Sequence, residues 1–193
     1  MSKDVKIRKG VNIKLKGSAE KLYADAISTS DIVLKPTDFP GLTPKLAVKV
    51  GDKVKAGSPL FYNKENDKVM FTSPISGEVT EINRGEKRKI LEVKVKADGA
   101  NTYETFKQGD PANMAKEEIL DNMLKSGVWP FVRQRPFDVI ANPMDTPKAI
   151  HVTAFDSAPL APDFGFIAHG QGAILQAGLD ALTKLTSGKV HLH

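Results

Sequence analysis

Apolar and polar residues alternate in short runs between residues 46 and 95, and turn-forming residues interrupt the runs at close intervals. A repeat with a period of two residues puts every second side chain on the same face, which is typical of a strand with one buried face. The interruptions contain glycine or proline at five positions: Gly51, Gly57, Pro59, Pro74 and Gly85. The pattern predicts many short antiparallel strands joined by tight turns.

The same stretch contains two similar half-units. The first has the motif G-D-x-V-x-x-G at residues 51–57, and the second has P-x-S-G-x-V at residues 74–79. Residues 63–67 between them are polar and turn-forming, as expected at the tip of a hairpin. Two half-units around a protruding hairpin predict a small flattened barrel, and the two motifs together resemble the biotinyl/lipoyl-like barrel-sandwich domain.

That resemblance draws attention to Lys68, because carrier domains of this class bear biotin or lipoate on a hairpin lysine. The biotin signature would place methionine on both sides of the lysine, where this chain has Asp67 and Val69. The pair Asp67-Lys68 does match the lipoyl pattern. A solvated hairpin lysine is the favoured interpretation, and a carrier domain with Lys68 as its attachment site remains the alternative.

After residue 101 the apolar spacing becomes helical. A helix is expected to start at Asp110-Pro111, since proline is tolerated in a first turn, and to end at Ser126-Gly127, since glycine commonly closes a helix. Its predicted apolar face consists of Met114, Ile119, Leu120, Met123 and Leu124.

A strand at residues 149–155, a helix at 171–186 and the start of a strand at 190–192 predict a strand–helix–strand unit. We interpret this unit as the first part of a Rossmann-like α/β domain. The predicted fold class is therefore mixed. A barrel-sandwich domain occupies residues 30–100, and a helix with an incomplete α/β domain occupies residues 101–193.

Residues 1–29 form a separate N-terminal region with a predicted strand and loop. Residues 3–16 carry six Lys or Arg against one acid, and Val11, Ile13 and Leu15 alternate with polar residues. The pattern predicts a strand with a basic outer face. Such a face is either solvated or docks on a partner or on anionic lipid.

Composition excludes several kinds of site. The 193 residues carry a net charge of +5 and contain no cysteine, which excludes disulfides and cysteine-ligated zinc or iron–sulfur centres in them. The four histidines, at positions 151, 169, 191 and 193, lack metal-ligand spacing, and no P-loop or G-x-G-x-x-G motif occurs. No Lys or Arg occurs in residues 149–183. We expect this stretch to be buried in its own domain or against a partner.

Two loops carry apolar side chains that no regular structure requires. One contains Phe39 and Leu42, and the other contains Trp129, Phe131 and Phe137 around two arginines, at positions 133 and 135. These loops either fold over the core or line a site for an apolar ligand. Aromatic residues with arginine can also stack a nucleic-acid base, but no basic stripe accompanies them, so no nucleic acid is expected.

Five segments together resemble the A subunit of the sodium-translocating NADH:quinone oxidoreductase, and the resemblance covers nearly the whole chain. They are residues 71–77 (FTSPISG), 82–88 (INRGEKR), 126–129 (SGVW), 133–137 (RQRPF) and 155–161 (FDSAPLA). Members of that family are more than twice as long. The resemblance therefore implies a chain that stops inside the α/β domain.

The resemblance implies a peripheral subunit on the cytoplasmic side of the bacterial inner membrane. The complex oxidises NADH, reduces ubiquinone or menaquinone and pumps sodium, using flavins and iron–sulfur centres. The other subunits, chiefly the membrane-embedded ones, are the implied partners. The fold is similar to that of the flavin-binding subunit of respiratory complex I and of the C subunit of the Rnf complex.

Those relatives hold flavin on a glycine-rich loop, of which only Gly127 remains here. Bulky Trp129 and Phe131 would block the close backbone approach that a phosphate needs, so no flavin and no other cofactor is expected in this chain.

Quinone interaction has been attributed to the family, and the two apolar loops are the matching candidates. The expected quinone-binding residues are Phe39, Leu42, Phe131, Arg133 and Phe137, with Arg135 as a second candidate donor. A shared site requires the two loops to converge in space.

Overall fold

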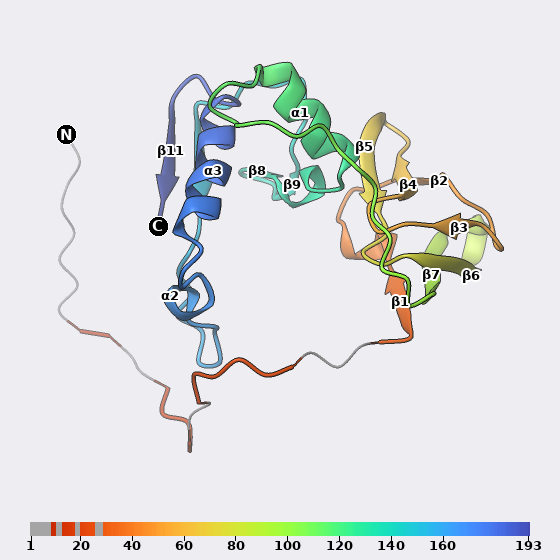
Figure 1. The fold of residues 1–193 in the computed structure, drawn as a ribbon, viewed down its shortest axis with the longest axis horizontal. Helices are drawn as coiled ribbons and strands as arrows, with labels where there is room; N and C mark the ends of the chain where they lie inside the picture. Colours follow the sequence, from red (N-terminus) through yellow and green to blue (C-terminus); the bar gives the residue numbers. More distant parts are fainter. Residues whose placement is uncertain (1–8, 11–12, 18–19, 26–28) are drawn as a thin grey trace.

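The computed structural model describes residues 9–10, 13–17, 20–25 and 29–193 (Figure 1). Seven strands before residue 100 form two facing antiparallel sheets. The first sheet has the order β1-β7-β6-β3, with β1 at Asp31–Leu34, β7 at Ile90–Ala97, β6 at Gly77–Arg84 and β3 at Lys53–Val54. The second has the order β2-β4-β5, with β2 at Pro44–Leu46, β4 at Pro59–Asn63 and β5 at Asn66–Thr72. We call these two sheets the barrel.

The barrel confirms the predicted barrel-sandwich fold and its many short antiparallel strands. Gly51 and Gly57 have φ of +91° and +99°, values that favour glycine in a turn. The hairpin between β4 and β5 turns at residues 64–65, inside the predicted tip. Apolar and polar residues also alternate at positions 47–50, but these residues lie outside the strands. A short 3₁₀ turn, η2 (Glu86–Arg88), joins β6 to β7.

The barrel core lies between the two sheets. Its fully buried side chains come from both: Leu60, Phe61, Val69 and Phe71 from one, and Val79, Val93 and Val95 from the other. Burial of each such side chain contributes about 1.5–3 kcal/mol relative to exposure.

Helix α1 (Lys116–Lys125) packs against β5 and buries Ile119 and Leu124. Its end at Ser126 confirms the prediction, and Gly127 follows with φ of +77°. The predicted start at residues 110–111 is wrong. The Asp110 carboxylate accepts hydrogen bonds from the Ala112 amide and the Asn113 side chain, which forms a local turn. Ala115 is then extended, with φ of −71° and ψ of 153°, and its amide donates to the Glu118 carboxylate, so the helix begins only after it.

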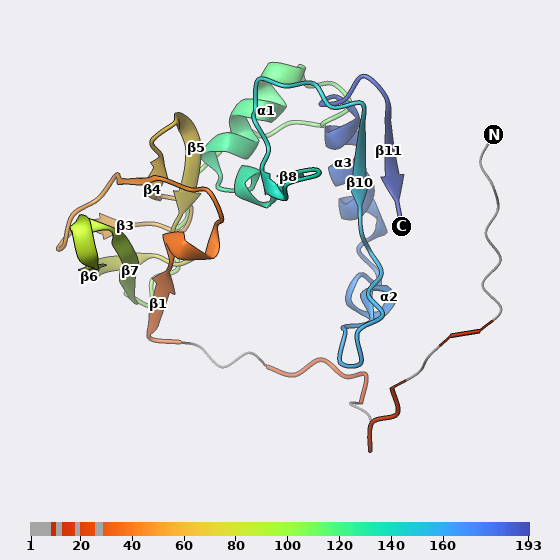
Figure 2. The ribbon, with the colours of Figure 1, turned by 180° about the vertical axis from the view of Figure 1, so that it is seen from behind.

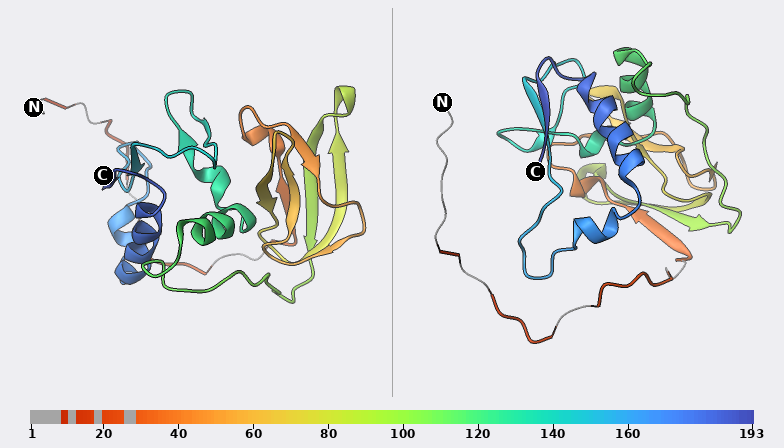
Figure 3. Two further views of the ribbon diagram at one scale, coloured as in Figure 1. Left: turned by 90° about the horizontal axis from the view of Figure 1, so that it is seen from above. Right: turned by 60° about the vertical axis from the view of Figure 1, so that its left-hand side comes forward.

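A compact connection follows α1. It contains the 3₁₀ turn η3 (Trp129–Phe131) and a small hairpin of β8 (Arg133–Gln134) and β9 (Val139–Ile140). The prediction that this loop folds over the core is confirmed for Trp129, which is buried, and is wrong for Phe131 and Phe137, which are exposed. Figure 3 shows α1 and this hairpin lying between the barrel and the remaining elements.

The remaining elements form a second lobe, residues 149–193. Strands β10 (Ala149–Val152) and β11 (Lys189–Leu192) pair in parallel, with α2 (Phe164–Ile167) and α3 (Gly172–Thr183) between them in sequence (Figure 2). The predicted strand–helix–strand unit is confirmed, and α2 is an additional helix for which no prediction was made.

The expectation that residues 149–183 are buried within their own domain is wrong. Helix α3 has no buried residue, and Ile174 is 72% exposed. A two-stranded sheet covers too little of a helix to bury its apolar face. Burial against a partner is the part of the expectation that stays a prediction.

Two predictions near the N-terminus also need correction. Residues 13–15 lie outside any strand, so the predicted basic strand is wrong for them, while Val11 and residues 3–8 lie outside the described residues. The loop at residues 35–44, where no regular structure is expected, contains the 3₁₀ turn η1 (Pro36–Asp38). Proline fits the first position of such a turn because its fixed φ is already helical.

Candidate functional site

The loop after β1 places Phe39 over the edge of the barrel core. The Phe39 amide donates to the Pro36 carbonyl at 3.2 Å, which closes η1. The Phe39 ring meets Phe71 of β5 edge to face at a centroid distance of 4.7 Å, and Phe71 stacks on buried Phe61 at 4.8 Å. Each such pair contributes about 0.5–1.5 kcal/mol beyond burial. A row of aromatic rings therefore anchors Phe39.

The segment after α1 brings Phe131 to the same place. Gly127 turns the chain, and the Trp129 indole nitrogen donates to the Ala141 carbonyl at 2.8 Å, which fixes η3 against β9. The centroid of the Phe131 ring lies 6.4 Å from that of the Phe39 ring, with an angle of 69° between the ring planes. The two loops therefore meet, which confirms the condition that a shared site requires.

The other expected residues differ in their surroundings. Leu42 is half-buried and packs against the core. Phe137 lies in the turn between β8 and β9 and is 84% exposed, against 74% for Phe131. Arg133 is half-buried, and its Nη1 donates to the Asp138 carbonyl at 3.3 Å. No ring contact joins Phe137 to another aromatic residue in the part of the chain that the structure describes.

The contact of Phe39 with Phe131 forms an apolar surface that is open to solvent. A planar conjugated ligand can pack on such rings, and the guanidinium groups of Arg133 or Arg135 can donate to a carbonyl oxygen. The two cavities described below lie elsewhere and do not include these side chains. Because Phe131 is 74% exposed, the surface supplies one wall of a site and leaves the opposite side open.

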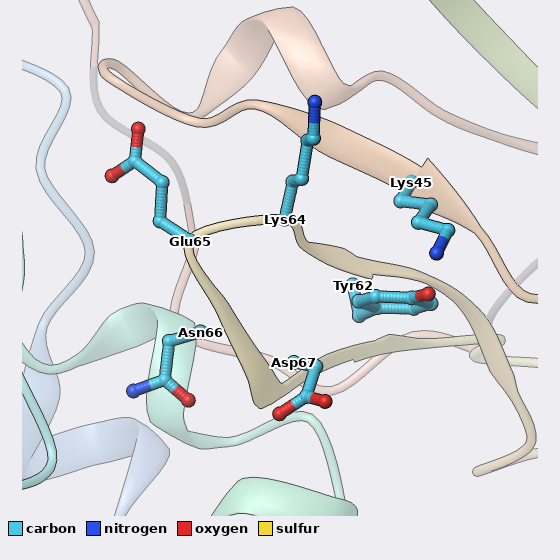
Figure 4. Close-up of a pocket in the computed structure, with 6 residues that line it drawn as sticks. All are labelled: Lys45, Tyr62, Lys64, Glu65, Asn66 and Asp67. Atoms are coloured by element: carbon cyan, nitrogen blue, oxygen red, sulfur yellow. The ribbon is translucent and has the colours of Figure 1, made fainter.

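The first of these cavities, about 410 Å³, lies at the β4–β5 hairpin beside β2 (Figure 4). Lys45 and Tyr62 point toward one another, with the Lys45 ammonium 5.6 Å from the ring centroid. Tyr62, by hydrogen bonding and then by charge attraction, raises the pKa of Lys45 above its ordinary value. Lys64, Glu65 and Asp67 complete a lining of two cations and two acids. This balance suits a small charged ligand better than an apolar one.

Lys68 lies near that hairpin, but not at its tip. It is the third residue of β5 and is exposed. Its amide donates to the Asn66 side chain at 3.2 Å. An exposed strand position is compatible with the solvated lysine that the sequence favours, and attachment of a cofactor stays untested.

The second cavity, about 510 Å³, lies across β3, β6 and β7 and is lined by Lys53, Lys96, Glu78 and Asp98. Thr80 also lines it, although its Oγ1 atom is buried and has no hydrogen-bond partner in the described residues. A shift in the β6–β7 register occurs at this position. Its charged lining residues are two cations and two acids, as at the first cavity.

Three histidines gather on β10 and β11. His151 Nδ1 lies 2.8 Å from His193 Nε2, and the rings of His151, His191 and His193 stack within 17° of parallel. Ring nitrogens direct their lone pairs in the ring plane, so stacked rings do not converge on one ion. No group of three possible ligands that could hold a metal occurs in the residues that the structure describes.

Sequence reasoning missed Phe71 and the pair of Lys45 with Tyr62. The alternation in β5 predicts that Phe71 is buried, but nothing local shows that it supports Phe39. Lys45 and Tyr62 face one another because β2 pairs with β4 in that register. No helix in the described residues has the length and apolar character needed to cross a membrane.

Comparison with known proteins agrees with this architecture. Residues 5–98 match the family described as the NqrA N-terminal barrel-sandwich hybrid domain, and residues 114–193 match the NqrA second alpha/beta domain. The chain belongs to the NqrA family, the A subunits of the Na(+)-translocating NADH-quinone reductase. The resemblance inferred from the sequence and the mixed fold class are thereby confirmed.

Individual members of the family are similar over nearly all of this chain. The proteins named as the A subunits of the Na(+)-translocating NADH-quinone reductase from Tolumonas auensis and Saccharophagus degradans are 38% and 36% identical to it, over 97% and 96% of its length. The protein of that name from Pseudomonas aeruginosa is 37% identical over 94%. The chain spans 41–43% of the length of these relatives.

Proposed function

We propose that this chain is part of a peripheral subunit of a sodium-pumping NADH:quinone reductase, in which it supports quinone reduction coupled to sodium transport. The names of its relatives support membership in such a complex. The contact between the Phe39 and Phe131 rings carries the proposal for a quinone site, because it joins two loops that are far apart in sequence.

The proposed site contains Phe39, Leu42, Phe131, Arg133 and Phe137. A quinone head group is planar and apolar with two carbonyl oxygens, so it needs ring surfaces and a hydrogen-bond donor. Phe39 and Phe131 supply the surfaces, and Arg133, or Arg135 in the following turn, supplies the donor. Because the surface is open, the opposite wall comes from a partner, which we propose to be a membrane-embedded subunit of the complex.

The rest of the proposal concerns placement and cofactors. The subunit lies on the cytoplasmic side of the bacterial inner membrane, with residues 30–100 as one domain and residues 101–193 as the start of the next. The flavins and iron–sulfur centres of the complex belong to other subunits. This chain binds neither FMN nor NADH, since Gly127 is followed by bulky Trp129 and Phe131 where a phosphate loop would need small residues.

Quinone-analogue binding to the assembled complex tests the site. Phe39→Ala and Phe137→Ala should each weaken binding, with Phe131→Ala as a third variant at the ring contact. Leu160→Ala is a matched control, because Leu160 is equally exposed but lies in the second lobe. Unchanged binding with both Phe39 and Phe137 replaced would place the quinone site in another subunit.

A further inference from the structure

Residues 20–25, here called the strap, lie beside the segment that contains α2 (Figures 1 and 3). Lys21 pairs with the Asp163 carboxylate. The Tyr23 ring stacks on Phe166 at 4.7 Å, and its hydroxyl donates to the Phe166 carbonyl at 2.7 Å. A tight turn, in which the Leu22 amide donates to the Glu20 carbonyl at 3.1 Å, lies between these contacts, and both Lys21 and Tyr23 reach the α2 region.

The receiving surface is the first turn of α2. The Asp163 carboxylate accepts from the Phe166 amide at 3.0 Å, which caps the helix, and it also receives Lys21. Both contacts stabilise its charged form, and the lysine is the larger cause of the lowered pKa of Asp163. The strap therefore acts on the same carboxylate that organises α2.

The charges of the two surfaces are complementary. Residues 149–183 contain Asp156, Asp163 and Asp180 but no Lys or Arg. Any Lys or Arg that pairs with Asp163 within this chain therefore comes from outside residues 149–183, and Lys21 is that residue. The strap also brings an aromatic ring to Phe166, which is half-buried.

We propose that α2 is a docking surface for the chain's own strap, and that this contact is a clasp that couples the second lobe to the barrel. Shortly after the strap in sequence, Asp31 opens β1, which pairs with β7 in the barrel. Lys21 and Tyr23 thus tie α2 to the part of the chain that precedes this strand. Opening the clasp releases α2 while the barrel keeps its core and β10 stays paired with β11.

The clasp is weak enough to open readily. Tyr23 is 71% exposed, and the Lys21 and Asp163 side chains are 66% and 45% exposed. Exposed ion pairs are screened by salt, and a single aromatic pair corresponds to a change of about 2- to 12-fold in an opening equilibrium. Closure therefore depends on both contacts.

Hydrogen exchange of the full-length protein tests the proposal, read at peptides that cover α2. Tyr23→Ala should raise the exchange of the Ile167 and Ala168 amides about 2- to 12-fold, the range of one aromatic pair. Lys21→Ala should remove the dependence of that exchange on salt. Leu22→Ala is the matched control, since it lies between the two contacts, is exposed, and should leave the exchange unchanged.

Two results would overturn the proposal. The first is exchange at α2 that neither Lys21→Ala nor Tyr23→Ala alters. The second is protection that disappears on dilution, because the strap would then dock on a second copy rather than on its own chain. In each experiment the exchange of the β6 and β7 amides is the reference for global unfolding.

Discussion

Gly127→Ala is expected to displace the segment that carries Phe131. Gly127 has φ of +77°, and a Cβ atom there would lie 2.3 Å from Thr72 Oγ1 and 3.2 Å from both Thr72 Cβ and Cγ2. Thr72 Oγ1 donates to the Ser126 carbonyl at 3.1 Å, so the loop and β5 are already in direct contact. An added methyl group has no room unless the loop moves away from the strand.

The cost has two parts. Alanine in the left-handed region costs about 1–2 kcal/mol, and overpacking at a tight contact costs about 1–3 kcal/mol, so the free energy of unfolding should fall by about 2–5 kcal/mol. That is a large fraction of the 5–15 kcal/mol typical of a folded domain. Movement of the loop should also expose Trp129, which follows Gly127 closely and is buried.

The assay is urea denaturation followed by tryptophan fluorescence, since Trp129 is the only tryptophan in the 193 residues. The variant should unfold at lower urea, and its native emission should shift to longer wavelength. Gly51→Ala is the matched control in the barrel. Its φ is +91° and no atom lies within 4 Å of the added Cβ, so it should show the backbone cost of about 1–2 kcal/mol alone.

A second substitution tests the cause. Thr72→Ala removes Oγ1 and Cγ2, and alone it should cost about 0.5–1.5 kcal/mol for the lost hydrogen bond. Combined with Gly127→Ala it should relieve the overlap. The double variant should therefore lose less free energy of unfolding than the two single variants lose in sum. Strict additivity, or a Gly127→Ala variant no less stable than Gly51→Ala, would refute the steric argument.

Three further predictions follow from single sites. Gly77→Ala should prevent the barrel from folding, seen as lost β signal in circular dichroism, because the added Cβ would lie 1.9 Å from the Lys96 carbonyl oxygen. The pKa of Asp98 is lowered, chiefly by the hydrogen bond from Ser76, so folding gains stability above about pH 4 that should be lost as the pH falls below it. Asp98→Asn should reduce that loss in denaturation curves measured at pH 3 and pH 6. Lys68 should stay unmodified after co-expression with biotin and lipoate ligases, and a biotinyl or lipoyl increment in the intact mass would contradict this.

The sequence was sufficient to predict most of the local secondary structure of this protein. The alternation in residues 46–95 identified the strands, and glycine at 51, 57 and 127 marked turns and a helix end, because side-chain period and positive φ are properties of neighbouring residues. The strand–helix–strand order of residues 149–193 followed in the same way. The start of α1 could not be predicted, since Ala115 is not a usual capping residue, and the Glu118 side chain instead accepts from its amide.

Contacts between distant segments were decided by the tertiary structure alone. The sequence proposed Phe39 and Phe131 as members of one site, but only the packing of both loops around β5 brings their rings together. The sequence also showed that residues 149–183 lack Lys and Arg. Only the fold shows that many of these residues are exposed and that Lys21 pairs with Asp163. Periodicity reports which face of an element is apolar. What lies against that face depends on how the whole chain packs, which no local pattern contains.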